Sequence, residues 1–313
     1  MTASPVKPAI PPYRVPHFDA PIVRGRLCNA MSIDVEDYFQ VQAFDGQVAR
    51  GDWETLEWRF AANTNRILDM LAQENIKATF FTLGWVAQRC KPLIRRMANE
   101  GHEIASHGMA HFRADEQTPE AFRRDISEAK AILEDAGGVP VTGYRAATFS
   151  IGAKNMWAFD ILAEEGYRYS SSINPVQHDL YGLPDAPRAP FYPCPNEAIP
   201  EIPITTVHLF GRNMPFGGGG FFRLLPYPVF RWGLRRVNHT DQLPCIYYMH
   251  PWEIDPGQPR ITGAPLKSRI RHYLNLSRTE PRLRQLLKDF AWDRVDNVYA
   301  ALLKSGTAQK THD

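Results

Sequence analysis

The sequence predicts a single α/β domain organised as one parallel barrel. Seven strand-like segments alternate with helical segments along the 313 residues, and three of the apolar strands end directly at ionisable residues. Alternation of this kind is typical of parallel sheets, and a barrel with a polar site at its strand ends places ionisable side chains at such positions. The sequence shows neither an internal repeat nor a linker that would separate two domains.

The composition excludes several classes of protein. Hydrophobic residues make up 44% of the chain and aromatic residues 12%, so the chain can bury a large core and is not intrinsically disordered. The formal net charge is +2 and the isoelectric point is about 8.3. This charge is too balanced to predict a nucleic-acid-binding groove.

The two ends of the chain and its cysteines bear on the domain bounds and on the cellular compartment. Residues 1–25 are rich in proline and predict an extended arm, which leaves residues 26–313 as the barrel domain with a C-terminal helical extension. We find no apolar segment typical of a signal peptide or a membrane span, so we expect a cytoplasmic protein, with periplasmic export through a partner as the alternative. No cysteine pairing is predicted, because Cys28, Cys90, Cys194 and Cys245 are widely spaced.

Each predicted strand is a short apolar segment followed by turn residues or polar side chains. The first ends at Asp34, the third leads directly into a pair of histidines, and the seventh ends at His250. The predicted strands are residues 27–33, 77–82, 101–106, 141–144, 167–171, 202–210 and 244–249.

The predicted helices carry apolar residues at helical spacing. The clearest start signal is Thr118 as N-cap followed by Pro119 at the first helical position. The predicted helices are residues 63–73, 92–99, 118–136, 155–165, 226–237 and 279–303. Residues 174–203 predict an irregular excursion, and the glycine run 217–220 lacks the Lys-Ser/Thr of a phosphate-binding loop, so we expect flexible backbone near the cleft there.

The segment 106–111, Ser-His-Gly-Met-Ala-His, is the strongest indication of a metal site. His107 and His111 are four residues apart, and they lie on one face if the backbone turns helically. Imidazole nitrogens together with a carboxylate suit zinc with an open position for water, although non-haem iron uses the same ligand types.

A third ligand is expected from the acidic cluster after the first strand. If Asp34 points into the site, Glu36 points to the same side by strand alternation, so that one can be a general base and the other a ligand. Asp37 faces the other way unless the loop turns there, and it is kept as an alternative ligand. Acidic residues after strands also serve as helix caps or solvated turns.

Two further residues are candidates for acid–base chemistry. Arg145 ends a strand and can pair with the base carboxylate. His250 ends the last strand, and an imidazole can donate a proton to a leaving amine near neutrality.

Aromatic residues near these motifs are candidates for contact with a sugar. The loop from Asp37 to Trp58 is longer than an ordinary barrel connection, and long ordered loops are often functional. Tyr38, Trp53, Trp58 and Trp252 either line a cleft or cover the end of the barrel.

The set Asp34, His107-x-x-x-His111, Arg145 and His250, in this order, resembles the NodB-homology polysaccharide deacetylases of carbohydrate esterase family four. The resemblance spans roughly residues 27–255. It implies a deformed (β/α)7 barrel, a divalent metal that is usually zinc, and hydrolysis of an N-acetyl group on a sugar.

The resemblance also implies roles for single residues. Asp34 matches the general base, and His107 and His111 match metal ligands. Arg145 matches the arginine that braces the base, and His250 matches the acid. The backbone N–H that contacts the oxyanion is expected at Thr148.

The sequence departs from the family pattern at several positions. Val35 stands where the family's metal-binding aspartate is usual, and an Asp-x-Asp spacing like that of some members would make Glu36 the ligand. The arginine motif lacks its proline, and Tyr248-Met249-His250 replaces Leu-x-His. No aspartate that would support the acid is evident around residues 169–172.

The segments 31–39 and 250–256 resemble the deacetylases found with exopolysaccharide and exosortase gene clusters. We therefore expect a metal-dependent hydrolase that removes N-acetyl groups from an exopolysaccharide or its lipid-linked precursor. The alternatives are an allantoinase-like hydrolase of a small cyclic amide and a catalytically weak carbohydrate-binding protein on the same fold.

Overall fold

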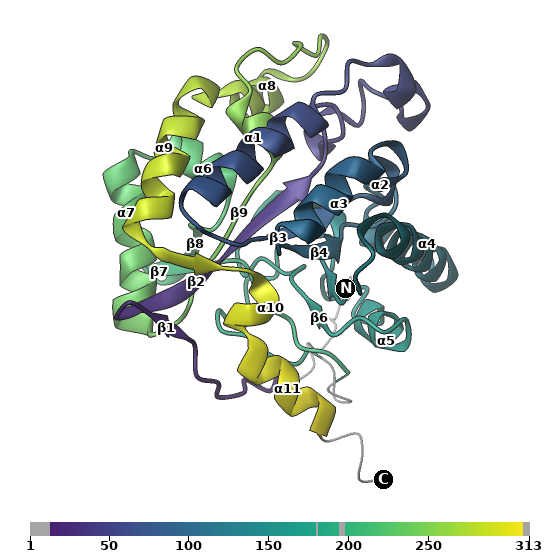
Figure 1. Ribbon diagram of the computed structural model, residues 1–313. Coiled ribbons are helices and arrows are strands. Elements are labelled where there is room, and N and C mark those ends of the chain that lie inside the picture. Colours follow the sequence, from purple (N-terminus) through teal and green to yellow (C-terminus); the bar gives the residue numbers. More distant parts are fainter. Residues whose placement is uncertain (1–12, 180, 194–197, 309–313) are drawn as a thin grey trace, which may run out of the picture.

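A computed structural model describes residues 13–179, 181–193 and 198–308 (Figure 1). Its centre is a curled sheet in which β2 lies between β3 on one side and β9 and β10 on the other. From β3 the sheet continues through β4 and β5 to β6, and all of these pairings are parallel. The prediction of a single α/β domain with a deformed barrel is thereby confirmed.

The strands are β1 Ile22–Val23, β2 Arg26–Val35, β3 Thr79–Thr82, β4 Glu103–Ser106, β5 Gly143–Tyr144, β6 Tyr169–Ser170, β7 Thr206–Leu209, β8 Arg212–Pro215, β9 Ile246–Met249 and β10 Ala291–Asp293. The helices are α1 Phe60–Gln73, α2 Gly84–Arg89, α3 Lys91–Asn99, α4 Pro119–Gly137, α5 Ala158–Glu164, α6 Gly219–Leu224, α7 Tyr227–Arg236, α8 Leu266–Tyr273, α9 Leu276–Asp289, α10 Val295–Val298 and α11 Ala300–Ala308. Short 3-10 turns include η1 Gln42–Phe44, η2 Arg50–Thr55, η4 Ala147–Phe149 and η6 Pro251–Ile254.

Strand β2 is central because it is apolar enough to be covered on both faces. Its residues from Cys28 to Val35 are all buried, as expected for a strand inside a parallel sheet with helices on its outer side. Helix α4 begins where the sequence predicts, since the Thr118 hydroxyl accepts a hydrogen bond from the Ala121 N–H. It ends at Gly138, which has the left-handed φ of +69°.

The predicted sixth strand, residues 202–210, is wrong as a barrel strand. Residues Thr206–Leu209 form β7, which pairs antiparallel with β8 in a separate two-stranded sheet. The reason is the hairpin turn at Phe210-Gly211, where both residues have positive φ. Isolated parallel bridges fill the space between β6 and β9, joining Ser170 to Glu201 and Gly218 to Tyr248.

The predicted continuous helix at residues 279–303 is also wrong. Helix α9 ends at Asp289, and residues Ala291–Asp293 form β10, which pairs in parallel with β2 at Cys28–Ala30. The half of β2 that β9 does not reach needs a backbone partner, and β10 supplies it. Helices α2, α6 and α8 were not predicted from the sequence.

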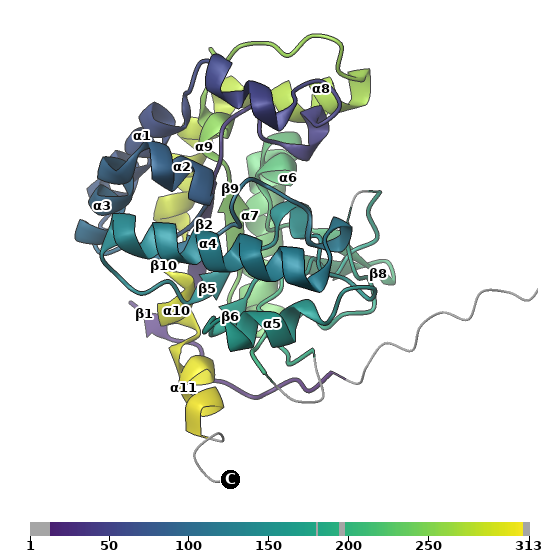
Figure 2. The same ribbon diagram turned by 90° about the vertical axis from the view of Figure 1, so that its right-hand side faces the viewer.

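The two ends of the sheet are covered differently (Figures 1 and 2). At one end the long loop that carries η1 and η2 lies beside α8, and at the other end lie α10 and α11. Within the described residues, no helix is both long and apolar enough for a membrane crossing. Cys28, Cys90 and Cys245 are free thiols, and Cys194 lies outside the described residues, as does the arm up to residue 12.

Candidate active site

A cavity of about 440 Å³ opens where the parallel strands end. It lies at the end of the sheet covered by η1 and α8, since Ala43 and Ile270 both line it. The predicted residues that line the cavity are Asp34, Glu36, His107, His111, Thr148, His250 and Trp252. The strand ends therefore bring together residues that are up to 218 positions apart in the sequence.

Glu36, His107 and His111 form the cluster that could hold a metal ion. One ligand atom from each lies within 4.8 Å of the others, and all three side chains are buried. The histidines do not converge through a helix, contrary to the prediction. The chain after β4 is an irregular loop in which Gly108 has φ +77° and His111 has φ +54°.

The protonation of this cluster fits a cation. Burial opposes ionisation of Glu36, but the charges of His111 and His250 outweigh it and hold its pKa at about 2. Burial lowers the pKa of His107 to about 4, so that its imidazole is neutral. His107 Nδ1 lies 2.8 Å from the Arg145 carbonyl oxygen, and donation there leaves Nε2 free as a ligand.

Buried polar atoms without hydrogen-bond partners support the same interpretation. Glu36 Oε2 is buried and accepts no hydrogen bond, although it lies 3.0 Å from His111 Nε2. His111 Nδ1 also lacks a partner. Buried polar atoms usually have partners, so an unsatisfied carboxylate oxygen beside two imidazoles is an arrangement suited to binding a cation. The donor set of two histidines and one carboxylate matches catalytic zinc sites.

Two residues that the sequence analysis missed hold the histidine loop. Arg50 donates to the carbonyl oxygens of Ala110 and His111, both at 2.9 Å. Asp125 accepts the Met109 N–H at 3.1 Å. A Cβ on Gly108 would lie 2.8 Å from the Asp125 carboxylate, so this position requires glycine for space as well as for φ. Neither residue belongs to a motif, so no local sequence signal would have revealed them.

Asp34 is paired with Arg145 at the end of β2. The guanidinium Nη1 donates to Asp34 Oδ1 at 2.6 Å and to the Ser32 hydroxyl at 2.9 Å. Arg145 also donates to the backbone carbonyl and the hydroxyl of Ser171, and both members of the pair are buried. These contacts fix the Asp34 carboxylate in one orientation at the wall of the cavity.

Thr148 lines the cavity from the short turn η4 that follows Arg145. Its backbone is left-handed, with φ +55°, a conformation that is uncommon for a threonine. The turn thus places Thr148 on the cavity wall together with Asp34, and its contact with an oxyanion stays a prediction.

His250 lies across the cavity from the histidine loop. Its Nε2 is 3.5 Å from Glu36 Oε1, and its Nδ1 is 2.8 Å from Glu253 Oε1. Burial opposes protonation of His250, but the Glu36 and Glu253 carboxylates outweigh it and raise its pKa to about 9. A protonated imidazole at this place is suited to proton donation.

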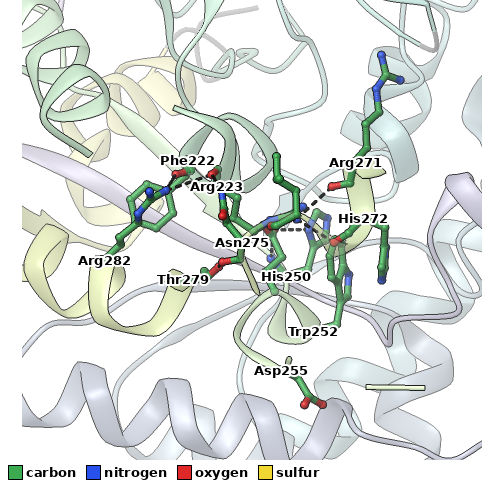
Figure 3. Close-up of polar contacts among 12 residues, drawn as sticks. Phe222, Arg223, His250, Trp252, Asp255, Arg271, His272, Asn275, Thr279 and Arg282 are labelled. Carbon is green, nitrogen blue, oxygen red and sulfur yellow. Dashed lines mark hydrogen bonds and ion pairs between the residues drawn. The ribbon is translucent and has the colours of Figure 1, made fainter. Parts of the chain in front are cut away.

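Two aromatic side chains, Trp252 and His272, stack in a row with the His250 ring (Figure 3). The Trp252 ring stacks on the His250 ring with centroids 5.1 Å apart, and on its other side it stacks on His272 at 4.0 Å. Trp252 is 5% exposed. It therefore contributes a wall of the cavity and support for the imidazole.

The structure contradicts three predicted site positions. Asp37 is not in the metal cluster, because the chain turns after Glu36 and its carboxylate accepts the backbone N–H groups of Tyr38, Arg59 and Phe60. Trp53 is 2% exposed and packs against Phe39 and other aromatic rings instead of lining the cavity. Tyr38 is 1% exposed and also lies outside the cavity lining.

Comparison with protein families gives a match for most of the chain in two parts. Residues 50–170 match the family described as polysaccharide deacetylase. Residues 171–300 match a family described as a domain of unknown function, DUF3473. His107, His111 and Arg145 lie in the first segment and His250 in the second.

Curated relatives match over short segments. A peptidoglycan-N-acetylglucosamine deacetylase of Bacillus cereus is 39% identical over 75 residues, which are 24% of this chain and 27% of the relative. A chitooligosaccharide deacetylase of Rhizobium leguminosarum is 40% identical over 73 residues, which are 23% of this chain and 34% of the relative. The chain thus spans about a third or less of these two proteins.

A solved structure resembles nearly the whole chain. It is described as a candidate polysaccharide deacetylase from Mycobacterium smegmatis, and it superposes with a TM-score of 0.55 at 19% identity. The match covers 95% of this chain and 96% of that protein. At this identity the likeness establishes the fold.

Proposed function

We propose that this protein is a metal-dependent deacetylase that hydrolyses N-acetyl groups on amino-sugar residues. The observation that carries the proposal is the cluster of Glu36, His107 and His111, which faces Asp34 and His250 across one cavity. The match to deacetylases over residues 50–170 and the names of the relatives support the same chemistry.

Glu36, His107 and His111 would hold a divalent ion, and the ligand types favour zinc. Such an ion supplies Lewis-acid polarisation of an acyl carbonyl. Asp34, held in place by Arg145, accepts the proton of the attacking water. The Thr148 backbone N–H donates to the oxygen that becomes negatively charged. When the C–N bond breaks, its electron pair passes to nitrogen, and His250 donates the proton from Nε2 to that nitrogen.

The substrate belongs to the proposal as well. A cavity of about 440 Å³ is of the size that encloses a small ligand or one part of a larger one. The resemblance of segments 31–39 and 250–256 to deacetylases of exopolysaccharide gene clusters favours an exopolysaccharide or its lipid-linked precursor as the carrier of the N-acetylated sugar.

The test combines metal content and acetate release. Elemental analysis is made on wild type, Glu36→Ala and Asp37→Asn after purification without added metal, and acetate release is measured with tetra-N-acetylchitotetraose and with N-acetylated exopolysaccharide. We expect about one zinc per chain in wild type and in Asp37→Asn, and loss of both metal and turnover in Glu36→Ala.

Two outcomes would overturn the proposal. Wild type that takes up no metal even when zinc is supplied would favour a metal-free hydrolase of a small cyclic amide. Wild type that binds metal and both saccharides without releasing acetate would favour the carbohydrate-binding alternative.

A further inference from the structure

A buried ion pair lies directly behind His250. Glu253 and Arg223 are 1% and 3% exposed, and Arg223 Nε donates to Glu253 Oε2 at 2.7 Å. The other carboxylate oxygen, Oε1, accepts from the backbone N–H of His250 at 3.0 Å and lies 2.8 Å from its Nδ1. One carboxylate thus connects a fully enclosed guanidinium to the imidazole and to the backbone of the same histidine.

Arg223 is itself fixed by the C-terminal end of α8 and the residue that follows it. Its Nη1 donates to the carbonyl oxygens of Arg271, His272 and Leu274 (Figure 3). Each of these residues also lines the cavity. The guanidinium therefore has partners on two sides, and Glu253 has little freedom to turn away from His250.

The glycine run 217–220 makes room for this arrangement. A Cβ on Gly219 would overlap the Glu253 carboxylate, and a Cβ on Gly218 would lie 2.8 Å from the Tyr248 ring. Gly219 is the first residue of α6, and Arg223 lies one turn later on the same helix. The glycine run thus allows α6 to approach the end of β9, which directly precedes His250.

We infer that Glu253 and Arg223 are positioning residues that orient His250 for proton donation to the leaving amine. This inference rests on the proposed function. Glu253 accepts a hydrogen bond from Nδ1–H, which directs Nε2–H toward the cavity. Arg223 holds the Glu253 carboxylate where it reaches both the backbone N–H and Nδ1 of His250. The segment described as a domain of unknown function would then supply the acid together with its support.

The test uses two substrates that differ in their need for an acid. Tetra-N-acetylchitotetraose has an amine leaving group, which needs a proton, whereas 4-nitrophenyl acetate releases nitrophenolate without one. We expect Glu253→Gln to lower kcat on the amide about 10- to 100-fold with little change in KM. Loss of the hydrogen-bond partner behind a metal-bound histidine has a cost of this size, and we expect a similar cost for the acid. Hydrolysis of the ester should change about threefold or less.

Asp255→Asn is the matched control. Asp255 is also a buried carboxylate near His250 in the sequence, but it pairs with Arg59 and Asn63 and lies apart from the His250 network (Figure 3). We expect it to lower thermal stability and to leave the ratio of amide to ester turnover unchanged. Equal loss on both substrates in Glu253→Gln, or the same change of ratio in Asp255→Asn, would overturn the inference.

Nitrogen-15 NMR of the histidine rings separates this inference from the proposed function, because it needs no turnover. We expect a proton on His250 Nδ1 in wild type and a changed Nδ1 shift in Glu253→Gln. A wild-type ring with a bare Nδ1 would overturn the inference even in an active enzyme. If Glu253→Gln fails to fold because Arg223 stays buried without its partner, Glu253→Gln/Arg223→Met removes both charges and takes its place in both measurements.

Discussion

The two sides of the cavity are held in place by different means. On the metal-and-base side (Asp34, Glu36, His107, His111 and Arg145), the histidine loop is held largely through backbone groups, such as the carbonyls that accept from Arg50. On the acid side (Arg223, His250, Trp252, Glu253 and His272), the imidazole depends on one carboxylate and on stacked rings. Substitution of a supporting side chain should therefore displace the backbone of the histidine loop on the first side and the imidazole ring itself on the second.

The largest expected effect is on the metal-and-base side. Asp34→Asn should lower kcat on tetra-N-acetylchitotetraose by about 10²- to 10⁴-fold, the usual contribution of general base catalysis, and it should keep its metal because Asp34 is not in the cluster. Kinetics and elemental analysis on the same preparation check both parts. A near-normal rate would show that the base is another residue.

The aromatic cluster beside the metal-and-base side should affect stability alone. Trp53 is enclosed by Phe39, Trp85 and neighbouring rings, so Trp53→Ala should cost about 3–5 kcal/mol of unfolding free energy. Urea unfolding measures this loss. KM for the tetrasaccharide should not change in the folded protein, and a strong rise in KM would restore Trp53 as a substrate contact.

A methyl group next to Glu253 should disturb the acid side. Gly219→Ala should lower kcat on the amide about tenfold or more, because the added Cβ displaces the carboxylate that supports His250. Gly220→Ala adds the same group where nothing lies within 4 Å, and its effect should be much smaller. Similar rates for the two variants would contradict the role of the glycine run.

The smallest expected effect concerns a histidine outside the cavity lining. His102, just before β4, is buried, and burial lowers its pKa to about 4. Because the unfolded histidine takes up a proton near pH ~6.5 and the folded one does not, stability should fall by about 2 kcal/mol between pH 7 and pH 5. Below pH 4, protonation of His102 should cause no further loss of stability.

Urea unfolding at these pH values checks the contribution of His102. His102→Gln keeps an acceptor for the Ala78 N–H, which His102 Nδ1 accepts at 3.1 Å, and it should remove this part of the pH dependence. An unchanged slope in the variant would assign the acid sensitivity to another group.

The site residues near the strand ends could be predicted from the sequence. Asp34 lies near the end of β2, and His107 and His250 directly follow β4 and β9. The periodicity therefore places these three at one end of the sheet, and the four-residue motif spacing places His111 beside His107. Glu36 was expected on the side of Asp34 by alternation, and both line the cavity. Their catalytic roles stay predictions.

Other parts of the fold and the site could not be predicted from the sequence, because they depend on contacts between distant segments. Arg223 lies 30 residues before its partner Glu253 on a short helix that shows no clear period. Trp53 was a candidate for contact with a sugar because tryptophan suits both a core and a binding surface. The sequence does not distinguish these two environments. Strand β10 has only three residues, too few for a periodic signal.

The position of β10 has a consequence for synthesis of the chain. One edge of β2 is paired in succession by β10 and β9, so its backbone is completed only by residues from 246 to 293. On the ribosome, this edge of the strand that carries Asp34 stays unpaired until more than 200 further residues have been made, although β3 on the other edge follows much sooner. Pairing over such sequence distances is slow, and an exposed apolar strand edge invites aggregation in the meantime. Chaperone dependence during translation would follow from the order of the strands rather than from the chemistry of the site.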